Sequence, residues 1–356
     1  MAREIPKKSK IAVGLSGGVD SSVSALILKK AGFEVTGVHM QCWDYDAKGC
    51  TGKQDRADAV ATASVLGLPF VALDFVHEYS ELVMKYFYSE YKAGRTPNPD
   101  ILCNKEIKFG LFLNWALQQG FDYIATGHYA GIDFNKSDGL YELMRPVDLS
   151  KDQSYFLYAL NQAQLNHAIF PLSNINKSDV RRIAELNGLP SAAKPDSVGI
   201  CFVGNVEIRE FLKQNAGFKE EKGVVLNLSG KVIGDHNGAV FFTIGQRHGF
   251  TISDYTGVPL YVLNKNIKKN EIIVGTYEDC MLNSFEMEGI HWIGTPFTED
   301  FECEVRIRHL GQLYKGKVAI NGCKVVLHEK AFGIASGQSA VLYTNDKILG
   351  GGVIKC

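Results

Sequence analysis

The feature that most constrains the fold of this chain is a regular alternation, over its first third, of short apolar runs and segments with helical spacing. Strands are expected at 11–15, 34–40, 70–74 and 123–126, and helices at about 19–31, 53–67, 77–92 and 104–119. Such alternation is typical of a parallel sheet whose strands are connected through helices, so we predict an α/β fold. The ligand of such a sheet is expected at the carboxyl ends of the strands.

The chain changes character after about residue 205. Short β-prone runs broken by Gly and Asn occupy 223–262 and 271–275, and further strands are expected at 302–308, 315–320, 323–328, 339–343 and 348–355. Each region is too short for another α/β unit and fits a small β-barrel or sandwich. We therefore predict an α/β domain over residues 1–206 and two small β-rich domains, over 207–280 and over 281–356.

Composition excludes several classes of protein. Hydrophobic residues make up 46% and charged residues 22% of the chain, which excludes a disordered or coiled-coil protein. The formal net charge is -1, so any surface that binds nucleic acid has to be local. The sequence contains no apolar run long enough to span a membrane and no leader peptide, so we expect a cytoplasmic protein without a membrane partner.

The eight cysteines are scattered along the chain, at positions 42, 50, 103, 201, 280, 303, 323 and 356. None forms a C-x-x-C pair or a zinc-finger spacing, which disfavours a structural zinc site. In an intracellular chain of this length we expect reduced thiols rather than structural disulfides. The sequence leaves open whether one of these thiols is reactive.

The strongest local motif is SGGVDSS at residues 16–22, between the first predicted strand and the first predicted helix. Glycines let the backbone wrap around an anion, the helix N-terminus offers N–H groups, and the serines add hydroxyl donors, so we predict a phosphate-binding loop. The motif lacks the lysine of a kinase-like P-loop and the spacing of a dinucleotide fingerprint. The alternative is a Gly-rich turn with a Ser or Asp helix cap.

Cys103 follows a stiff segment, TPNPDIL at residues 96–102, at the predicted start of a helix. A helix N-terminus and the neighbouring Lys105 and Lys108 can lower a thiol pKa, so Cys103 could be a nucleophile; the alternative is a small buried apolar residue. Asp100 taken alone would be a helix cap. Cys201 lies in an apolar run and taken alone would belong to the core.

Several segments together resemble known families. SGGVDSS resembles the pyrophosphate loop of the N-type ATP pyrophosphatases (PP-loop family), which cleave ATP between the α- and β-phosphates. The wider set resembles the tRNA-specific 2-thiouridylases: NPDILCNKEIKF at 98–109, ATGHYA at 125–130, KDQSYFLY at 151–158, GICFVG at 199–204, TIGQRHG at 243–249 and GQSAVLY at 337–343. The resemblance extends over nearly the whole chain and includes both Cys103 and Cys201.

The resemblance implies a fold and an activity. Residues 1–206 would be a PP-loop catalytic domain of the adenine-nucleotide α-hydrolase type, followed by a small central β-rich domain and a C-terminal β-barrel that contacts tRNA. The enzyme would adenylate the C2 oxygen of the wobble uridine with ATP and Mg²⁺ and replace it by sulfur from a cysteine persulfide, releasing AMP and pyrophosphate. Its partners would be the anticodon stem-loop of a tRNA and a persulfide sulfur-carrier protein.

The resemblance also implies site residues. Cys201 would carry the persulfide, Cys103 would attack it or help to release the sulfur, leaving a transient disulfide between the two, and Asp100 would be the acid/base. The residues for ATP would be Gly14, Leu15, Ser16, Gly17, Gly18, Val19, Asp20, Ser21, Met40 and Gly127. Asp20 could help to bind Mg²⁺ or could cap the helix. Asn98, Pro99 and Asp100 would line the target base, and Lys151, Asp152, Gln153, Arg308 and His309 would contact tRNA.

Alternatives stay open at this point. An iron–sulfur cluster held by Cys103, Cys201 and a third ligand ranks below the persulfide route, because no third cysteine lies in a motif beside these two. Cys42 and the remaining cysteines are interpreted as packing or surface thiols. Arg306, Lys315 and Lys317 could grip an RNA backbone or could decorate an edge strand. Other readings are a PP-loop synthetase without thiols, a lysidine-type tRNA enzyme, and a non-catalytic RNA- or ATP-binding protein.

Overall fold

A five-stranded parallel sheet forms the centre of the N-terminal part, as predicted. The computed structural model describes residues 5–44, 52–196, 199, 201, 203, 207–253 and 257–356. The sheet has the strand order β3-β2-β1-β4-β7, and its strands are β1(Lys10–Gly14), β2(Glu34–Gln41), β3(Phe70–Asp74), β4(Tyr123–Ala125) and β7(Ala168–Ile169). Val13 in β1 pairs with Gly37 on one side and Ala125 on the other. The α/β class is confirmed.

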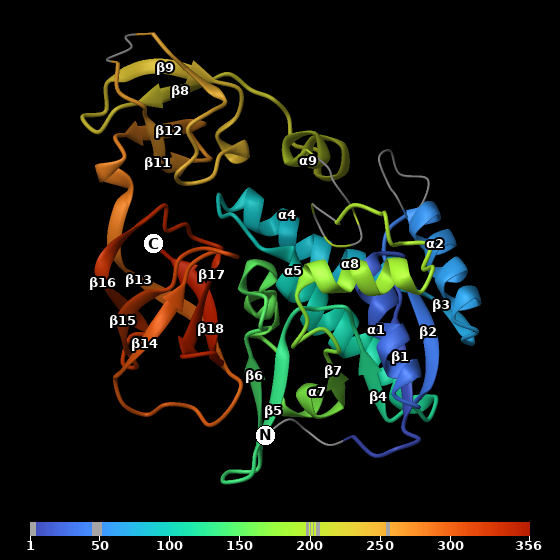
Figure 1. The fold of residues 1–356 in the computed structure, drawn as a ribbon. Helices are drawn as coiled ribbons and strands as arrows, with labels where there is room; N and C mark the ends of the chain where they lie inside the picture. Colours follow the sequence, from blue (N-terminus) through green and yellow to red (C-terminus); the bar gives the residue numbers. More distant parts are fainter. Residues whose placement is uncertain are drawn as a thin grey trace.

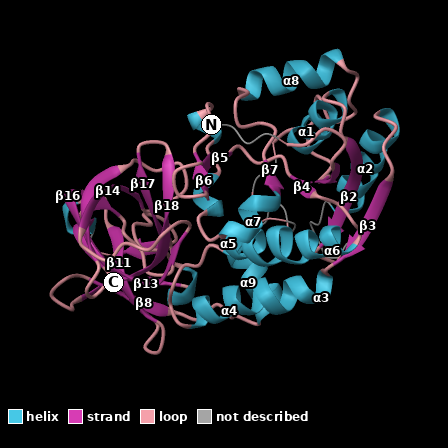
Figure 2. Ribbon diagram, turned by 90° about the horizontal axis from the view of Figure 1, so that it is seen from below, coloured by secondary structure: helices cyan, strands magenta, loops and turns pink. Residues whose placement is uncertain are grey.

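Helices cover both faces of this sheet (Figures 1 and 2). They are α1(Val19–Lys30), α2(Gly52–Val65) and α8(Lys177–Leu186) on one face, and α3(Val76–Tyr79), η1(Ser80–Met84), α4(Lys85–Lys92), α5(Pro99–Leu102), η2(Cys103–Phe112) and α6(Leu113–Gln118) on the other. Alternate residues of β1 supply the two cores: Ile11 and Val13 pack with the first set, and Ala12 packs with the second.

The helix predicted to begin near residue 104 begins earlier, so that boundary was wrong. Pro99 is the first residue of α5, and the side-chain oxygen of Asn98 accepts a hydrogen bond from the backbone N–H of Asp100 at 3.2 Å. Proline suits the first helical position because its missing N–H has no helical partner there. Asn98 is therefore the cap, and the reading of Asp100 as the cap residue is wrong. The helical stretch predicted over 77–92 is confirmed as α3, η1 and α4.

The C-terminal part is a closed six-stranded barrel, as predicted. Its strands are β13(Met281–Trp292), β14(Phe301–Arg306), β15(Tyr314–Ala319), β16(Lys324–Phe332), β17(Ser339–Thr344) and β18(Lys347–Lys355). The order is β13-β16-β15-β14-β17-β18, and β18 pairs back onto β13, which closes the barrel and leaves these six strands without a free edge. The sequence pattern missed most of β13, whose alternation of apolar and charged residues is irregular.

The central part is a separate small sheet, so the β-rich unit predicted between the α/β domain and the barrel is confirmed. Its order is β10-β9-β8-β12-β11, with β8(Gly223–Leu226), β9(Val232–His236), β10(Phe250–Ile252), β11(Tyr261–Asn266) and β12(Glu271–Gly275). The helix α9(Ile208–Ala216) precedes it. The boundaries predicted between 206 and 207 and between 280 and 281 stay predictions.

A hairpin from the N-terminal part joins the barrel. β5(Gly131–Asn135) and β6(Leu140–Met144) pair with each other, and β6 pairs with β18 through Leu143 and Ile348. Short helical segments follow it: η3(Leu149–Lys151), η4(Ser154–Leu157) and α7(Gln162–His167). The hairpin is labelled beside β18 in Figure 1. Sequence analysis did not anticipate the pairing of β6 with β18, because these two strands lie far apart in the chain.

A buried ion pair strengthens the junction between barrel and α/β domain. Asp152 is fully buried, and its Oδ2 accepts hydrogen bonds from Arg306 of the barrel at 2.8 Å and Arg145 at 2.9 Å. Burial alone would raise the pKa of Asp152, but the hydrogen bonds from Ser154, Arg306 and Arg145 outweigh it and lower the pKa. The proposed use of Arg306 on an RNA backbone is therefore wrong, and the Asp152 side chain points into the junction rather than to a surface.

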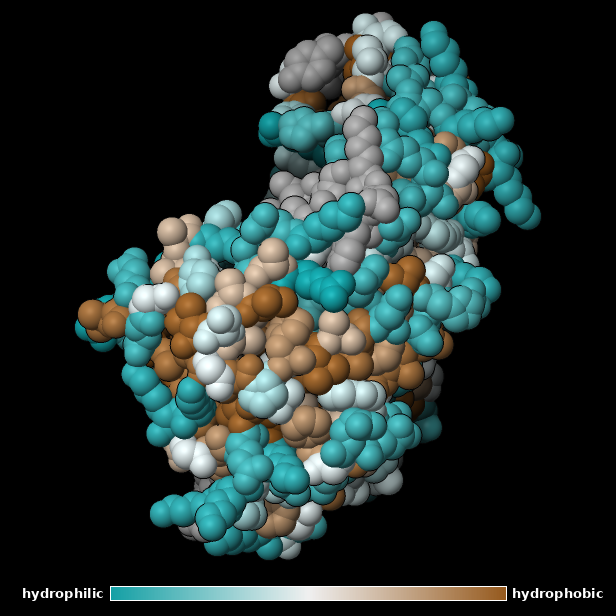
Figure 3. All heavy atoms as spheres, turned by 90° about the vertical axis from the view of Figure 1, so that its right-hand side faces the viewer, coloured by the Kyte–Doolittle hydropathy of each residue, from teal (hydrophilic) through white to brown (hydrophobic). Residues whose placement is uncertain are grey.

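The edge of the parallel sheet at β3 is apolar on its outer side. Val60 and Val65 of α2 are exposed, at 44% and 54% of their surface, next to this edge strand. In Figure 3, which faces that side of the molecule, apolar side chains gather over its middle.

No helix among the described residues is long and apolar enough to cross a membrane.

We predict that Arg306→Met destabilises the folded protein by about 3–5 kcal/mol, because it removes the cation from a buried ion pair. Urea unfolding followed by circular dichroism measures the change. The matched control is Lys317→Met in the same barrel, which removes an exposed pair with Asp300 and should cost at most about 1 kcal/mol. Equal destabilisation by the two substitutions would contradict the structural role of Arg306.

Candidate active site

The SGGVDSS segment forms a tight loop between β1 and α1. Gly17 has a φ of +78°, and a Cβ there would lie 2.3 Å from the carbonyl oxygen of Asp55, so the position requires glycine. The Ser21 hydroxyl accepts a hydrogen bond from the Ser16 N–H at 3.2 Å and donates one to the Gly18 carbonyl at 3.1 Å. Gly18 is the N-cap residue of α1 and has no side chain to cover the helix N-terminus. The loop thus directs backbone N–H groups to an anion.

The other residues predicted to bind ATP surround this loop. Gly14 ends β1, the Leu15 N–H donates to the Val38 carbonyl at 2.7 Å, and the buried Val19 begins α1. The Cε methyl of the buried Met40 lies 3.3 Å from where a Cβ on Gly14 would be. A Cβ on Gly127 would lie 2.7 Å from the Ser21 nitrogen. Their placement suits a nucleotide site at the carboxyl ends of the strands, while their individual roles stay predictions.

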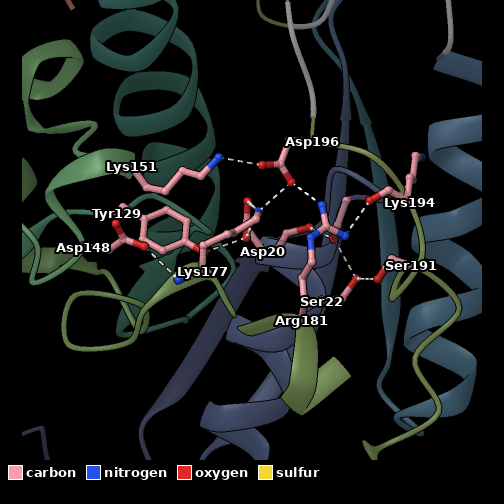
Figure 4. Close-up of polar contacts among 12 residues, drawn as sticks. Asp20, Ser22, Tyr129, Asp148, Lys151, Lys177, Arg181, Ser191, Lys194 and Asp196 are labelled. Atoms are coloured by element: carbon pink, nitrogen blue, oxygen red, sulfur yellow. Dashed lines mark hydrogen bonds and ion pairs between the residues drawn. The ribbon is translucent and has the colours of Figure 1, made fainter. Parts of the chain in front are cut away.

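A cluster of charged residues, which we call the Asp20/Asp196 cluster, lies next to the loop (Figure 4). It consists of Asp20, Lys151, Lys177, Arg181 and Asp196. The Lys177 ammonium is 2.7 Å from Asp20 and 2.9 Å from Asp196, and Lys151 is 2.8 Å from Asp196. The cluster puts three cations within reach of one phosphate loop.

Sequence analysis missed Lys177 and Arg181. Both are on α8, far along the chain from SGGVDSS, in a segment that reads as an ordinary amphipathic helix. The available signal was the position of Lys177, the first residue of α8, because the positive end of a helix dipole disfavours a cation there. A lysine in such a position is better explained by an anionic neighbour, which the structure supplies in Asp20.

Asp20 is held by two donors. Its carboxylate accepts both hydrogen bonds of Lys177, at 2.7 and 2.8 Å, and one from the Tyr129 hydroxyl at 3.0 Å. The N-cap of α1 is Gly18, so the reading of Asp20 as helix cap is wrong. A carboxylate beside a phosphate loop is a chemically suitable ligand for Mg²⁺, which prefers oxygen.

The two cysteines of the motifs come together on the other face of the sheet. Cys103 begins η2 and is fully buried, and its thiol lies close enough to the partly buried Cys201 for each to shift the pKa of the other. The Cys201 backbone is fixed on both sides: its N–H donates to Asp100 Oδ1 at 3.0 Å, and its carbonyl accepts from the Tyr79 hydroxyl at 2.8 Å. Two distant segments thus supply one thiol pair and a carboxyl group, and a third supplies the Tyr79 hydroxyl.

The two thiols differ in acidity. The hydrogen bond from Cys103 is the main cause that lowers the pKa of Cys201, with burial opposing and Lys108 assisting. Burial raises the pKa of Cys103 well above its usual range. The possibility that a helix N-terminus and nearby lysines lower the pKa of Cys103 is therefore contradicted, because the buried site favours its protonated form. Burial also raises the pKa of Asp100.

Cys42, which received no role in the sequence analysis, lies close to this pair. It is buried just after β2 in the same core as Cys103, and burial followed by the charge on Cys201 raises its pKa well above the usual range. Cys280 and Cys303 are buried elsewhere and Cys356 is exposed, as packing and surface thiols would be, while Cys50 lies outside the described residues.

The donor set does not fit an iron–sulfur cluster. Among the described residues, which include Cys42, Cys103 and Cys201, no three Cys, His, Asp or Glu side chains are grouped as ligands of one metal ion. We derive no step through such a cluster.

The residues predicted to contact the target base or tRNA have unequal access. Arg308 is exposed on the barrel, and Lys151 is partly exposed but paired with Asp196. His309 packs against Phe156 with ring centroids 4.3 Å apart and the rings tilted by 38°, and burial lowers its pKa to about 4, so it is neutral. The side chain of Gln153 accepts from the Tyr129 N–H at 3.0 Å. Beside the thiols, Asn98 is partly exposed and Pro99 is buried.

Comparisons with known proteins agree along the whole chain. Family models match as follows: tRNA methyl transferase HUP domain over 9–205, tRNA methyl transferase PRC-barrel domain over 209–276, and aminomethyltransferase beta-barrel domain over 282–354. The chain is 44% identical to the tRNA-specific 2-thiouridylase MnmA of Chromobacterium violaceum, over 99% of this chain and 94% of that protein. It is 43% identical to the MnmA of Streptococcus thermophilus, over 98% of this chain and 95% of the relative.

One solved structure is more distantly similar. It is the U34-tRNA thiolase NcsA of Methanococcus maripaludis with its 4Fe-4S cluster, at 20% identity and a TM-score of 0.36, covering 59% of this chain and 68% of that one. A likeness at that level assigns no ligand to this chain.

We predict that Gly127→Ala weakens ATP binding by at least about tenfold, or ~1.4 kcal/mol. Its methyl group would overlap the backbone of Asp20 and Ser21 and displace the phosphate loop. Isothermal titration with a non-hydrolysable ATP analogue measures the affinity. Gly294→Ala is the control, because its nearest neighbour would lie at an ordinary 3.7 Å. Unchanged affinity in Gly127→Ala would exclude the predicted close approach.

We predict that Cys201 is alkylated by iodoacetamide at a lower pH than an ordinary thiol, whose pKa is about 8.5, while Cys103 and Cys42 resist. Thiolate forms as pH rises through the pKa, so the lowered pKa of Cys201 moves its reaction to lower pH. Peptide mass spectrometry across pH 5.5–9 resolves the three sites. Labelling of Cys103 before Cys201 would show that the acidities are reversed.

Proposed function

Because the chain belongs to the family of tRNA-specific 2-thiouridylases, which form 2-thiouridine in tRNA with ATP, we propose that Cys103, Cys201 and Asp100 carry out the sulfur transfer in this protein. The observation that supports these roles is the contact between the two thiols, from distant segments, beside a buried carboxyl group. Neither a PP-loop synthetase nor a lysidine-type enzyme requires such a pair.

The first step activates the base. The C2 oxygen of uridine is a poor leaving group, and adenylation converts it into a phosphate ester as pyrophosphate leaves. Residues 14–21 bind the ATP phosphates through backbone N–H groups, with Met40 and Gly127 beside the loop. Lys177, only 12% exposed, offsets the negative charge that develops as pyrophosphate departs. Mg²⁺ would be held by the phosphates and Asp20, and would supply further charge neutralisation.

The second step supplies sulfur. The Cys201 thiolate attacks the terminal sulfur of a carrier persulfide, which forms a Cys201 persulfide and releases the carrier thiolate. The terminal sulfur then attacks C2, and AMP leaves with the former C2 oxygen. Cys103 attacks the Cys201 sulfur, which frees 2-thiouridine and leaves a Cys103–Cys201 disulfide. An external thiol reductant must supply two electrons to restore the pair.

Asp100 acts as the acid/base next to these thiols. Its raised pKa means that it holds a proton at higher pH than an ordinary aspartate, which suits a group that gives a proton to, or takes one from, the uridine or Cys103. Asn98 and Pro99 line the same side of the target base, because Asn98 caps the helix that carries Asp100.

The tRNA has to present its wobble uridine outside the anticodon stack, as for other enzymes that modify bases. Arg308 on the barrel and Lys151 at the Asp20/Asp196 cluster are the charged residues placed for the RNA backbone, with Gln153 and His309 as neutral neighbours. Asp152 would contribute by holding the barrel in place. A persulfide sulfur-carrier protein would bind where Cys201 is partly exposed.

We predict that the protein, given ATP, a persulfide donor and unmodified tRNA, forms AMP and 2-thiouridine, and that Cys103→Ser and Cys201→Ser each lower thiolation at least about 100-fold while pyrophosphate release from the adenylation step continues. Nucleoside mass spectrometry measures thiolation, and pyrophosphate release measures adenylation. Cys303→Ser, in the barrel core, is the control thiol.

Each of the other possible outcomes would favour a different function for this protein. Undiminished thiolation in both variants would remove the cysteines from the mechanism. AMP without thiolation in the unmodified protein would favour a different PP-loop reaction. Neither product from folded protein would favour a binding protein.

A further inference from the structure

The helix that begins with Cys103 has an unusual geometry. η2, over Cys103–Phe112, is a π-helix, in which the backbone pairs residues five apart instead of four. A Cβ on Gly110 would lie 3.0 Å from the carbonyl oxygen of Lys105, five residues earlier. In this geometry residues five apart return to the same side of the helix. Cys103 and Lys108 therefore share a side, which an α-helix would not allow.

A side chain from another helix supports this wide turn. The amide of Gln164, on α7, donates to the carbonyl oxygens of Lys105 at 3.1 Å and Phe109 at 2.9 Å. Gln164 is itself fixed by its capping box with Asn161. The widened backbone is thus built into the fold rather than left to fluctuate.

Lys108 reaches the reacting thiols from this position. The Lys108 ammonium and the Cys201 thiol interact, because the charge on each shifts the pKa of the other toward its charged form. The negative charge that Cys103 and Asp100 would carry when ionised also interacts with it. Lys108 is partly buried, where an ion interacts more strongly than in water. It is a cation directed at a sulfur atom that becomes anionic.

The remaining groups around Cys201 supply no second cation. The groups that face it are Asp100 and Cys103 on α5 and η2, Tyr79 on α3, and Cys42 after β2. His128, beside Lys108, is neutral, because burial and the Lys108 charge lower its pKa well below the usual range. Of these described neighbours, only Lys108 brings a positive charge to the thiol pair.

We propose that Lys108 is a catalytic residue that stabilises the anionic sulfur on Cys201, first as the thiolate that accepts sulfur and then as the persulfide. This proposal rests on the sulfur-transfer role of Cys201 given above. Lys108 transfers no atom: it offsets one negative charge while the sulfur–sulfur bond forms and while the terminal sulfur attacks C2. The sequence pattern placed this lysine beside Cys103, whereas the structure directs it to Cys201.

The test compares Lys108→Met with Lys108→Arg, which keeps the charge, and with Lys105→Met, which removes an exposed lysine from the same helix. Iodoacetamide labelling of Cys201 across pH 5.5–9 is the first readout. We expect Lys108→Met to move the labelling midpoint up by about one pH unit, which lowers labelling at pH 7 about tenfold. Lys108→Arg should shift it less, and Lys105→Met should not shift it.

Sulfur loading is the second readout. With a small persulfide donor, Lys108→Met should form the Cys201 persulfide about tenfold more slowly at pH 7 and approach the unmodified rate near pH 9, where the thiolate forms without help. A structural defect would not be rescued by pH. Adenylation of tRNA, measured as pyrophosphate release, should be unchanged. Lys108→Gln provides a second neutral variant if Lys108→Met does not fold.

Two results would overturn the proposal: an unchanged labelling midpoint in the folded neutral variants, or an equal shift in Lys105→Met. The sulfur-transfer mechanism fails separately. The labelling midpoint can move as expected while Cys201→Ser still thiolates tRNA. In that case Lys108 does lower the pKa of Cys201, but the catalytic roles of Lys108 and Cys201 are both overturned.

Discussion

The chemistry of this protein depends on two hydrogen bonds to the backbone of one residue. Asp100 and Tyr79 bind the N–H and the carbonyl of Cys201, and so bring a distant segment of chain to the start of the helix that carries Cys103. Without them the two thiols would belong to unrelated parts of the core. Asp100 thus positions Cys201, and its raised pKa suits the acid/base role proposed for it at the same place.

The environment gives two chemically identical thiols opposite tasks. Cys103 is buried and stays protonated, while Cys201 accepts its hydrogen bond and lies near Lys108, which favours the thiolate. The difference in acidity suits the proposed roles, in which Cys201 accepts sulfur and Cys103 keeps its proton until a later step. The π-helix is the device that allows this, because it places a thiol donor and an ammonium on one side of one helix.

On the opposite face of the sheet, charge links the nucleotide site to the chain that leads to Cys201. Lys177 bridges Asp20, in the phosphate loop, and Asp196, a few residues before Cys201. A phosphate in the loop would compete for the same ammonium. The barrel is joined to this framework by the ion pairs of Asp152 with Arg145 and Arg306, which hold the barrel against the α/β domain.

Sequence alone determined the parallel sheet, the phosphate loop and the barrel, because these depend on local signals: periodicity of two or 3.6 residues, glycines, and a motif within a few residues. The resemblance also singled out Cys103, Cys201 and Asp100. Only the tertiary structure decided which thiol is acidic and that Asp152 and Arg306 are buried. It also decided that Lys108 lies at the thiol pair and Lys177 at the phosphate loop. Those properties depend on burial and on charges from segments far apart in the chain, which no local pattern records.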